Sequence, residues 1–206
     1  RPVSSAASDV YKRQIPPFIS KFYCKSFTDP STRTSYPNCF FIHYLKMYNT
    51  LMLKNKFLSF ILFFIITFSA SFIGSLVTIN FKDPWYSQLV KSDFNPPDWI
   101  FAPVWTTLYL MMTVAIWFFW HSKSRDMNTI YIYFIHIIFN TTWSIVFFGL
   151  HQIFLALVVL VILIGLIITL VIRYKRVNFV SYYLMIPYLL WCCYALFLNI
   201  NLLILN

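Results

Sequence analysis

In three separate segments of this chain, Trp, Tyr and Asn side chains recur at intervals of three or four residues. In each segment this spacing places them on one face of a helix. Indole and phenol rings stack on flat aromatic molecules, and an amide supplies hydrogen bonds, so the three faces predict the lining of a pocket for a flat, largely apolar ligand. The faces comprise Trp105, Tyr109 and Met112; Tyr133, His136, Asn140 and Trp143; and Pro187, Trp191, Ala195 and Asn199.

Some of the same residue types have plainer interpretations. His136 could ligate haem iron, but an isolated histidine in a membrane helix is more often an interhelical hydrogen-bonding group, and we expect no metal site. The sequence has no CxxC, no HExxH, no Gly-rich phosphate loop and no supported Ser/His/Asp set, so no catalytic motif is recognisable. Four other tryptophans are expected to be anchors at the membrane interface: Trp85, Trp99, Trp117 and Trp120.

The elements that must position these side chains are membrane helices. The 206 residues are 60% hydrophobic, 21% aromatic and only 11% charged, whereas soluble domains carry about 25% charged residues. The apolar residues form runs of about twenty, long enough to cross a hydrocarbon core of about 30 Å. We therefore predict an all-α membrane protein, a bundle of five transmembrane helices at about residues 57–79, 99–120, 129–150, 153–172 and 179–205.

The net charge of +10 flanks the apolar runs and forms no basic face with interleaved aromatics, so a lipid bilayer and not nucleic acid is the expected partner. Cations in short loops mark the cytoplasmic side. An odd helix count then predicts a cytoplasmic N-terminus, with the long first loop and the C-terminus outside. The long apolar helices favour a bacterial inner membrane, with an outer membrane as the alternative. Seven cations lie on the expected cytoplasmic side and two on the other: Lys54, Lys56, Lys123, Arg125, Arg173, Lys175 and Arg176 against Lys82 and Lys91.

Residues 1–46 differ from the rest of the chain. They are rich in Ser, Pro and Thr, and they lack helical or strand periodicity. The opening RPVSSAASDVYKRQ resembles translated library-adapter sequence, so we expect a non-native or disordered leader. The biological chain would then begin at Met47 or Met52, and the membrane domain would occupy residues 47–206. A short basic extension on the membrane surface is the alternative.

Three blocks of sequence carry a family resemblance. WYSQLVKSDFNPPDWIFAPVWTTLYLMM (85–112), FNTTWSIVFFGLHQIFLAL (139–157) and PYLLWCCYALFLN (187–199) stand in an order and spacing similar to the signature blocks of the TspO/MBR family. This is the family of translocator proteins and tryptophan-rich sensory proteins, also called peripheral-type benzodiazepine receptors. The resemblance covers about residues 57–206 and rests on three different helices, which makes it specific.

The resemblance implies a five-helix membrane bundle, usually homodimeric, that binds tetrapyrroles such as protoporphyrin IX and haem. It also implies binding of isoquinoline carboxamide and benzodiazepine drugs and, in animal members, of cholesterol. No cofactor is required, and porphyrin or haem is the ligand. The family's pocket lies beneath the long first loop, and the matching positions here are Tyr86 and Pro96 in the loop lid, Trp105 and Tyr109, Asn140 and Trp143, and Trp191 and Ala195.

The chain departs from the family pattern at three places. Lys91-Ser92 replaces a common Lys-Pro, which would loosen the turn of the lid. Ile145 stands where the third block often has proline, so a straighter helix is expected there. The residues after Asn199 supply neither the Tyr nor the Lys/Arg of the cholesterol-associated pattern, so cholesterol binding is not expected.

Three functions follow from these observations. The first is a tetrapyrrole-binding membrane protein that acts in porphyrin sensing, transport or homeostasis, with Lys82 or Lys91 pairing with propionates. The second is an enzyme that degrades porphyrin in light, as reported for some bacterial members. Trp105 and Trp191 would then be the redox-active residues. The third is a small transporter of another amphipathic solute, but the chain has no internal repeat and no charge inside its helices, unlike most coupled transporters.

Overall fold

The computed structural model describes residues 55–206, and every structural statement below concerns these residues. Five of its helical segments are long and apolar enough to cross a membrane: Lys56–Phe81, Asp98–Trp120, Met127–Gly149, Ile153–Val177 and Phe179–Leu205. The predicted all-α, five-helix membrane fold is confirmed, and the described part of the chain contains no strand. The expected leader (1–46) and the expected starts at Met47 and Met52 lie outside the described residues.

The helix ends follow from local capping. In α4 (Lys56–Phe81), the Asn55 side chain accepts hydrogen bonds from the backbone N–H groups of Phe57 and Leu58. Helix α8 (Ile153–Val177) continues past the predicted end at 172, because Lys175 and Arg176 in its last turn favour the negative end of the helix dipole. Asn178 alone then separates α8 from α9 (Phe179–Leu205) and caps α9 through a hydrogen bond from Ser181 N–H.

Two predicted helices are irregular at the pocket side of the bundle. The second begins as a 3₁₀ turn, Asp98–Ile100, before α6 (Phe101–Trp120). The third is α-helical only over α7 (Met127–Ser144) and then widens into a π-helical turn, Ile145–Gly149. A straighter helix was expected around Ile145, and its straightness stays a prediction. Nothing in the sequence indicated the π-helical turn, in which the Leu150 N–H bonds back to the Ile145 carbonyl (2.9 Å) and an extra residue enters the turn.

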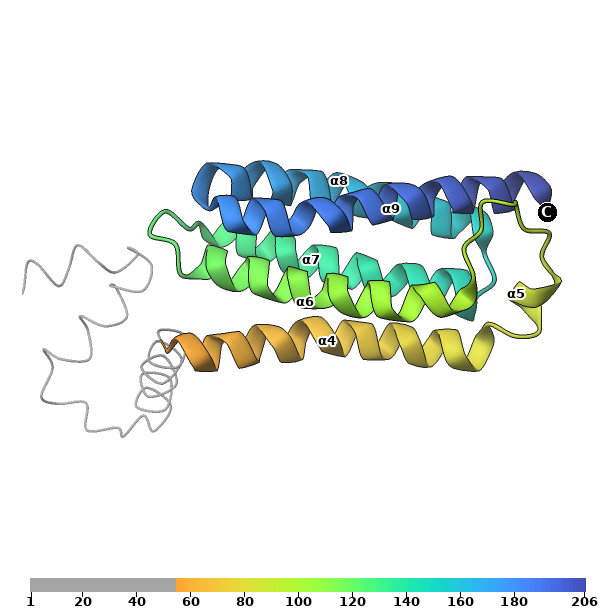
Figure 1. Ribbon diagram of the computed structural model, residues 1–206, viewed down its shortest axis with the longest axis horizontal. Helices are drawn as coiled ribbons and strands as arrows, with labels where there is room; N and C mark the ends of the chain where they lie inside the picture. Colours follow the sequence, from red (N-terminus) through yellow and green to blue (C-terminus); the bar gives the residue numbers. More distant parts are fainter. Residues whose placement is uncertain (1–54) are drawn as a thin grey trace, which may run out of the picture. The chain divides into compact units, whose positions relative to one another are not determined.

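The five helices form a ring in which each packs on two neighbours, in the order α4, α6, α9, α8, α7 and back to α4. Figure 1 shows them running side by side along one axis. Helices α6 and α7 face each other across the interior with few contacts of their own. At one end, which we call the basic end, lie six of the described cations: Lys56, Lys123, Arg125, Arg173, Lys175 and Arg176. The opposite end, the loop end, carries Lys82, Lys91 and the short helix α5 (Trp85–Gln88).

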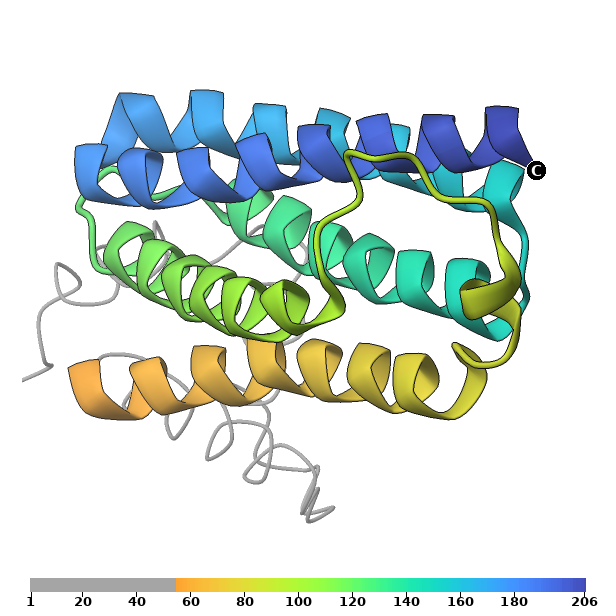
Figure 2. The ribbon, with the colours of Figure 1, turned by 45° about the vertical axis from the view of Figure 1, so that its right-hand side comes forward.

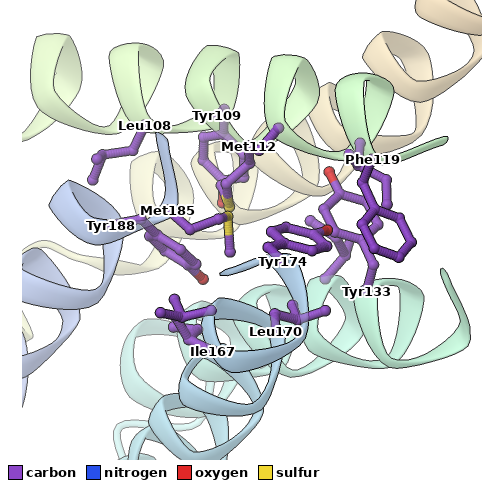
Figure 3. Close-up of a cluster of buried hydrophobic side chains, with 14 of the residues drawn as sticks. Leu108, Tyr109, Met112, Phe119, Tyr133, Ile167, Leu170, Tyr174, Met185 and Tyr188 are labelled. Atoms are coloured by element: carbon purple, nitrogen blue, oxygen red, sulfur yellow. The ribbon is translucent and has the colours of Figure 1, made fainter. Parts of the chain in front are cut away.

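The half of the ring toward the basic end is filled by side chains, and we call it the closed half. Several of its largest residues are fully buried, and Figure 3 shows some of them from four helices: Met112 and Phe119, Tyr133, Ile167, Leu170 and Tyr174, and Met185. Phe63 of α4 is buried there too. Some polar groups inside it are paired across helices. The hydroxyls of Thr67 and Tyr133 lie 2.6 Å apart, and the Ser181 hydroxyl donates to the Ala115 carbonyl at 2.7 Å. These bonds satisfy buried groups where lipid cannot. Nε2 of His136 and the Tyr174 hydroxyl have no such partner among the described residues.

The predicted orientation stays a prediction. The structure does place the six described cations of the expected cytoplasmic side at one end, with Lys82 and Lys91 at the other. Lys54, the remaining cation of that count, lies outside the described residues.

Candidate ligand pocket

The half of the ring toward the loop end contains a cavity of about 330 Å³, and we call it the open half. Its lining comes from α4, the lid segment 82–100, α6, α7 with its π-helical turn, and α9. Most of the lining is apolar, with a few amide, hydroxyl and charged groups, which is typical of small-molecule sites. The rings that line it are Tyr86, Phe101, Trp105, Tyr109, Trp143, Phe147, Phe148 and Trp191.

A hydrogen-bonded layer forms the floor of the pocket. The Tyr109 hydroxyl donates to Oδ1 of Asn140, and Nδ2 of Asn140 donates to the Tyr188 hydroxyl at 3.0 Å. One buried amide therefore joins α6, α7 and α9 at the level where the closed half begins. Trp105 covers this layer, with its ring centroid 5.7 Å from that of Tyr109 and 6.4 Å from that of Tyr188.

The π-helical turn shapes the α7 wall. Phe147 and Phe148 are consecutive, yet both line the pocket, because the wider turn changes the angular step between residues. Trp143 stacks on Phe147 with centroids 5.2 Å apart and planes 13° from parallel. A broad, flat aromatic surface results on this side of the cavity.

Small side chains on α4 create the space opposite that surface. Ser71, Gly74, Ser75 and Thr78 line the cavity. A Cβ at Gly74 would lie 3.1 Å from the Ser144 hydroxyl oxygen, so glycine permits α4 to approach α7 closely here.

Some polar atoms in the pocket wall have no protein partner. Nε1 of Trp143 and both amide atoms of Asn199 are buried, and they make no hydrogen bond within the described residues. Both residues line the cavity. An unmade hydrogen bond in an apolar environment costs about 1–3 kcal/mol, so these groups favour a ligand that carries polar atoms as well as an apolar face.

The lid segment closes the loop end. Tyr86, on α5, is 6% exposed, and its hydroxyl donates to Oδ1 of Asn95 at 3.3 Å. Burial raises the pKa of Tyr86, so its phenol stays neutral and able to donate. The Lys91 ammonium lies 4.1 Å from the centre of the Tyr86 ring, and Lys82 forms an ion pair with Asp98 at the mouth of the pocket.

The lid is also tied to α9. The Tyr194 hydroxyl donates to the Phe94 carbonyl at 2.7 Å, and the Asn206 side chain both accepts from the Val90 N–H (2.9 Å) and donates to the Val90 carbonyl (3.0 Å). Figure 2 shows the segment between α5 and α6 running across α9 toward the start of α6. These bonds fix the lid at two points along α9.

The structure brings together seven of the eight residues predicted to bind ligand. Tyr86, Trp105, Tyr109, Asn140, Trp143, Trp191 and Ala195 all line the cavity. Pro96 does not line it and lies within the lid, where its carbonyl accepts a hydrogen bond from Asn95 at 3.2 Å. That these residues bind a ligand stays a prediction.

Two residues of the predicted α7 face lie in the closed half and not in the pocket. Tyr133 and His136 are fully buried there, and Nδ1 of His136 lies 2.6 Å from the carbonyl oxygen of Tyr133. The interhelical hydrogen bond expected of His136 is absent from the described contacts. No group of three or more potential metal-ligating side chains gathers in residues 55–206.

Sequence reasoning missed several lining residues. Phe147 and Phe148 were not singled out, although Phe147 lies four residues after Trp143 on the same helix face. Phe148 joins the lining where the π-helical turn changes the angular step between residues. Asp98 was not singled out either, although it lies at the pocket mouth and pairs with Lys82. Only the short separation between the Lys82 and Asp98 segments at one predicted membrane boundary could have indicated this pair.

Comparison with known proteins agrees with the sequence blocks. The family model described as TspO/MBR family matches residues 61–205. The chain is 34% identical to the tryptophan-rich protein TspO of Chlorobaculum tepidum over 146 residues, which cover 67% of this chain and 89% of that protein. It is 34% identical to the tryptophan-rich protein TspO of Archaeoglobus fulgidus (66% and 88% covered) and 30% identical to the translocator protein of Bos taurus (62% and 78%). The chain belongs to the TspO/MBR family of integral membrane proteins.

Proposed function

We propose that this protein binds tetrapyrroles, such as protoporphyrin IX and haem, in the pocket of the open half, and that it acts in porphyrin sensing, transport or homeostasis. The observation that carries the proposal is the convergence of Trp105, Trp143 and Trp191, from three helices, on one cavity above a hydrogen-bonded amide. The names of relatives, tryptophan-rich sensory protein and translocator protein, suit sensing or transport.

The chemistry of a tetrapyrrole matches the two ends of this pocket. Its apolar π face would lie on the stacked rings of Trp143 and Phe147, and its carboxylate edge would point toward the lid. Lys82 lines the mouth and is held by Asp98, so a propionate would compete with that aspartate for the ammonium group. The unpartnered Trp143 Nε1 and Asn199 amide would find partners on the macrocycle or its substituents.

The test is quenching of tryptophan fluorescence by protoporphyrin IX in detergent. Saturable quenching is expected, and Trp143→Ala and Trp191→Ala should each weaken the apparent affinity about tenfold or more, since an aromatic contact and its burial are lost. Trp99→Ala is the matched control, because Trp99 is 74% exposed and does not line the cavity. Unsaturable quenching, or equal losses in all three variants, contradicts the proposal.

One observation favours an enzymatic alternative. Trp105 and Trp191 both line the cavity, and Trp105 lies near two tyrosines, so a light-excited porphyrin there would contact oxidisable rings. Under illumination in air, the Soret band of bound protoporphyrin should then decay faster than that of free porphyrin in the same detergent. Trp105→Phe and Trp191→Phe should slow this decay without abolishing binding. Equal decay of bound and free porphyrin excludes the enzymatic role.

A further inference from the structure

A second cavity, of about 310 Å³, lies at the basic end, at the opposite end of the bundle from the ligand pocket. We call it the arginine groove. It is formed between the start of α7 and the last turns of α8, and its lining is Asp126, Thr169, Ile172, Arg173, Arg176 and Val177. Two guanidinium groups face one carboxylate there, so the groove carries net positive charge.

The two arginines retain free hydrogen-bonding capacity. Arg173 reaches Asp126 and the Thr129 hydroxyl only at 3.4 Å, and the same Asp126 is already bonded to the Thr129 N–H and hydroxyl at 2.8 and 2.7 Å. Arg176 has no ion pair or hydrogen bond among the contacts of residues 55–206. A guanidinium carries five N–H donors in a rigid fork, which suits the paired oxygens of a phosphate group.

Neighbouring cations at this end are engaged differently. Arg125 donates to the Trp120 carbonyl at 2.7 Å and lies over the Trp120 ring, and the Lys175 ammonium lies 5.7 Å from the centre of the Tyr182 ring. Lys175 is adjacent to Arg176 in the chain yet does not line the groove. Arg176 therefore faces the groove, whereas Lys175, which carries the same charge on the adjacent residue, does not.

The groove opens onto an apolar face of α8. Ile172 and Ile168 stand one and two turns from Arg176 on the same side of the helix, and they are 48% and 42% exposed. One further turn on, a Cβ built at Gly165 would meet nothing within 4 Å, which leaves open space along this face. The groove thus continues into an apolar surface of a helix that is long and apolar enough to cross a membrane.

We propose that the arginine groove binds the headgroup phosphate of an anionic phospholipid, with an acyl chain along the Ile172, Ile168 and Gly165 face of α8. Charge favours an anionic over a zwitterionic lipid. Five cations and one acid occupy the segments that meet here, the α6–α7 loop and the last two turns of α8, and basic pockets between membrane helices bind anionic headgroups. The expected cytoplasmic position of this end agrees with the leaflet where such lipids attract cations.

The experiment measures thermal unfolding of the detergent-purified full chain with added phosphatidylglycerol, phosphatidylcholine or inorganic phosphate. Phosphatidylglycerol should raise the Tm in a saturable manner, and phosphatidylcholine and phosphate should not. Arg176→Gln should raise the half-saturating lipid concentration about tenfold, a loss typical of a charge-assisted bond. Lys175→Gln, which removes the same charge from the adjacent residue, should leave that concentration within about twofold of wild type.

The outcomes separate the alternatives. Equal losses in Arg176→Gln and Lys175→Gln overturn the proposal, because net charge alone would then explain binding. Stabilisation by inorganic phosphate at the same concentrations overturns the lipid assignment in favour of a free anion. Equal stabilisation by phosphatidylcholine excludes selection for an anionic headgroup. Arg176 has no partner to lose, so its variant should keep the lipid-free Tm of wild type.

Discussion

The open and closed halves are built from the same five helices, yet the interior of the open half contains a cavity of about 330 Å³, whereas the interior of the closed half is filled by side chains. In the closed half α4 contributes Phe63 and Thr67 to a filled interior, whereas in the open half it contributes Gly74 and Thr78. The layer through Asn140 separates the two. The size of the side chains along α4, together with the buried amide of Asn140, therefore determines where the bundle contains its cavity.

Polar groups without partners occur in both halves. The Thr67 and Tyr133 hydroxyls of the closed half pair with each other, but Nε2 of His136 and the Tyr174 hydroxyl, in the same half, have no hydrogen-bond partner among the described residues. In the open half the groups without partners are Trp143 Nε1 and the Asn199 amide, and these two residues line a cavity. A ligand in that cavity can therefore satisfy them, whereas the filled interior offers no space for one.

The largest expected effect comes from removing the layer between the halves. Asn140→Leu would leave the Tyr109 and Tyr188 hydroxyls without their amide partner, at about 1–3 kcal/mol for each stranded group. We expect the free energy of unfolding in detergent to fall by about 2–4 kcal/mol and porphyrin binding to weaken, because the floor loosens. Thr141→Val is the control, since its hydroxyl bonds only within α7, to the Ile137 carbonyl. Equal stability of the two variants would show that the layer does not hold the helices.

A smaller effect should follow from enlarging a small residue on α4. In Gly74→Val the added carbons meet Ser144, since even a Cβ lies 3.1 Å from its hydroxyl oxygen, and overpacking costs about 1–3 kcal/mol. The pocket should shrink, so porphyrin affinity should fall in the fluorescence titration. Gly165→Val on α8 is the matched control, because nothing lies within 4 Å of a Cβ there. If both variants bind porphyrin like wild type, small residues on α4 do not create the cavity.

The sequence predicted which side chains face the interior of the bundle, but it did not predict in which half they lie. The apolar runs and the i, i+4 columns placed Trp105, Tyr109, Asn140, Trp143 and Trp191 on inward faces, because periodicity reports orientation around a helix. Periodicity does not report depth. A face that extends from Tyr133 to Trp143 therefore crosses from the closed half into the open one, and the sequence assigned it to a single pocket.

The π-helical turn and the contacts that hold the lid could not be predicted, for a different physical reason. The π-helical turn at Ile145–Gly149 depends on which backbone bonds form against neighbouring helices, and no residue type encodes it locally. The bond between Asn206 and Val90 joins segments 116 residues apart in the chain, and the Lys82–Asp98 pair joins the end of one membrane helix to the start of the next. Such contacts exist only after the helices have packed, so local patterns carry little information about them.

A few-fold effect is expected at the mouth of the open half. Asp98→Asn removes the carboxylate that holds Lys82, and an exposed pair of this kind contributes about 0–1 kcal/mol to stability. Freed from Asp98, Lys82 should bind protoporphyrin IX a few-fold more tightly, whereas the dimethyl ester of protoporphyrin, which lacks free propionates, should bind as before. The paired titrations check this. Equal tightening for acid and ester would show that Asp98 acts on the lid and not through propionate charge.

The smallest effect should appear at the basic end, where lowering the pH should reduce the stability of the closed half through the protonation of one histidine. His121, just after α6, has its Nε2 2.8 Å from the Ser59 hydroxyl of α4, and burial, then Lys56 and Arg125, lower its pKa below the ordinary 6.5. Because the folded state disfavours the protonated ring, its contribution is complete above pH 6.5 and is lost as the pH falls through the lowered pKa. The Tm should therefore drop slightly between pH 7.5 and 5.5, and His121→Gln should lessen that drop. An unchanged drop in the variant would mean that other groups carry the pH dependence, and the basic end would then be no more acid-sensitive than the pocket.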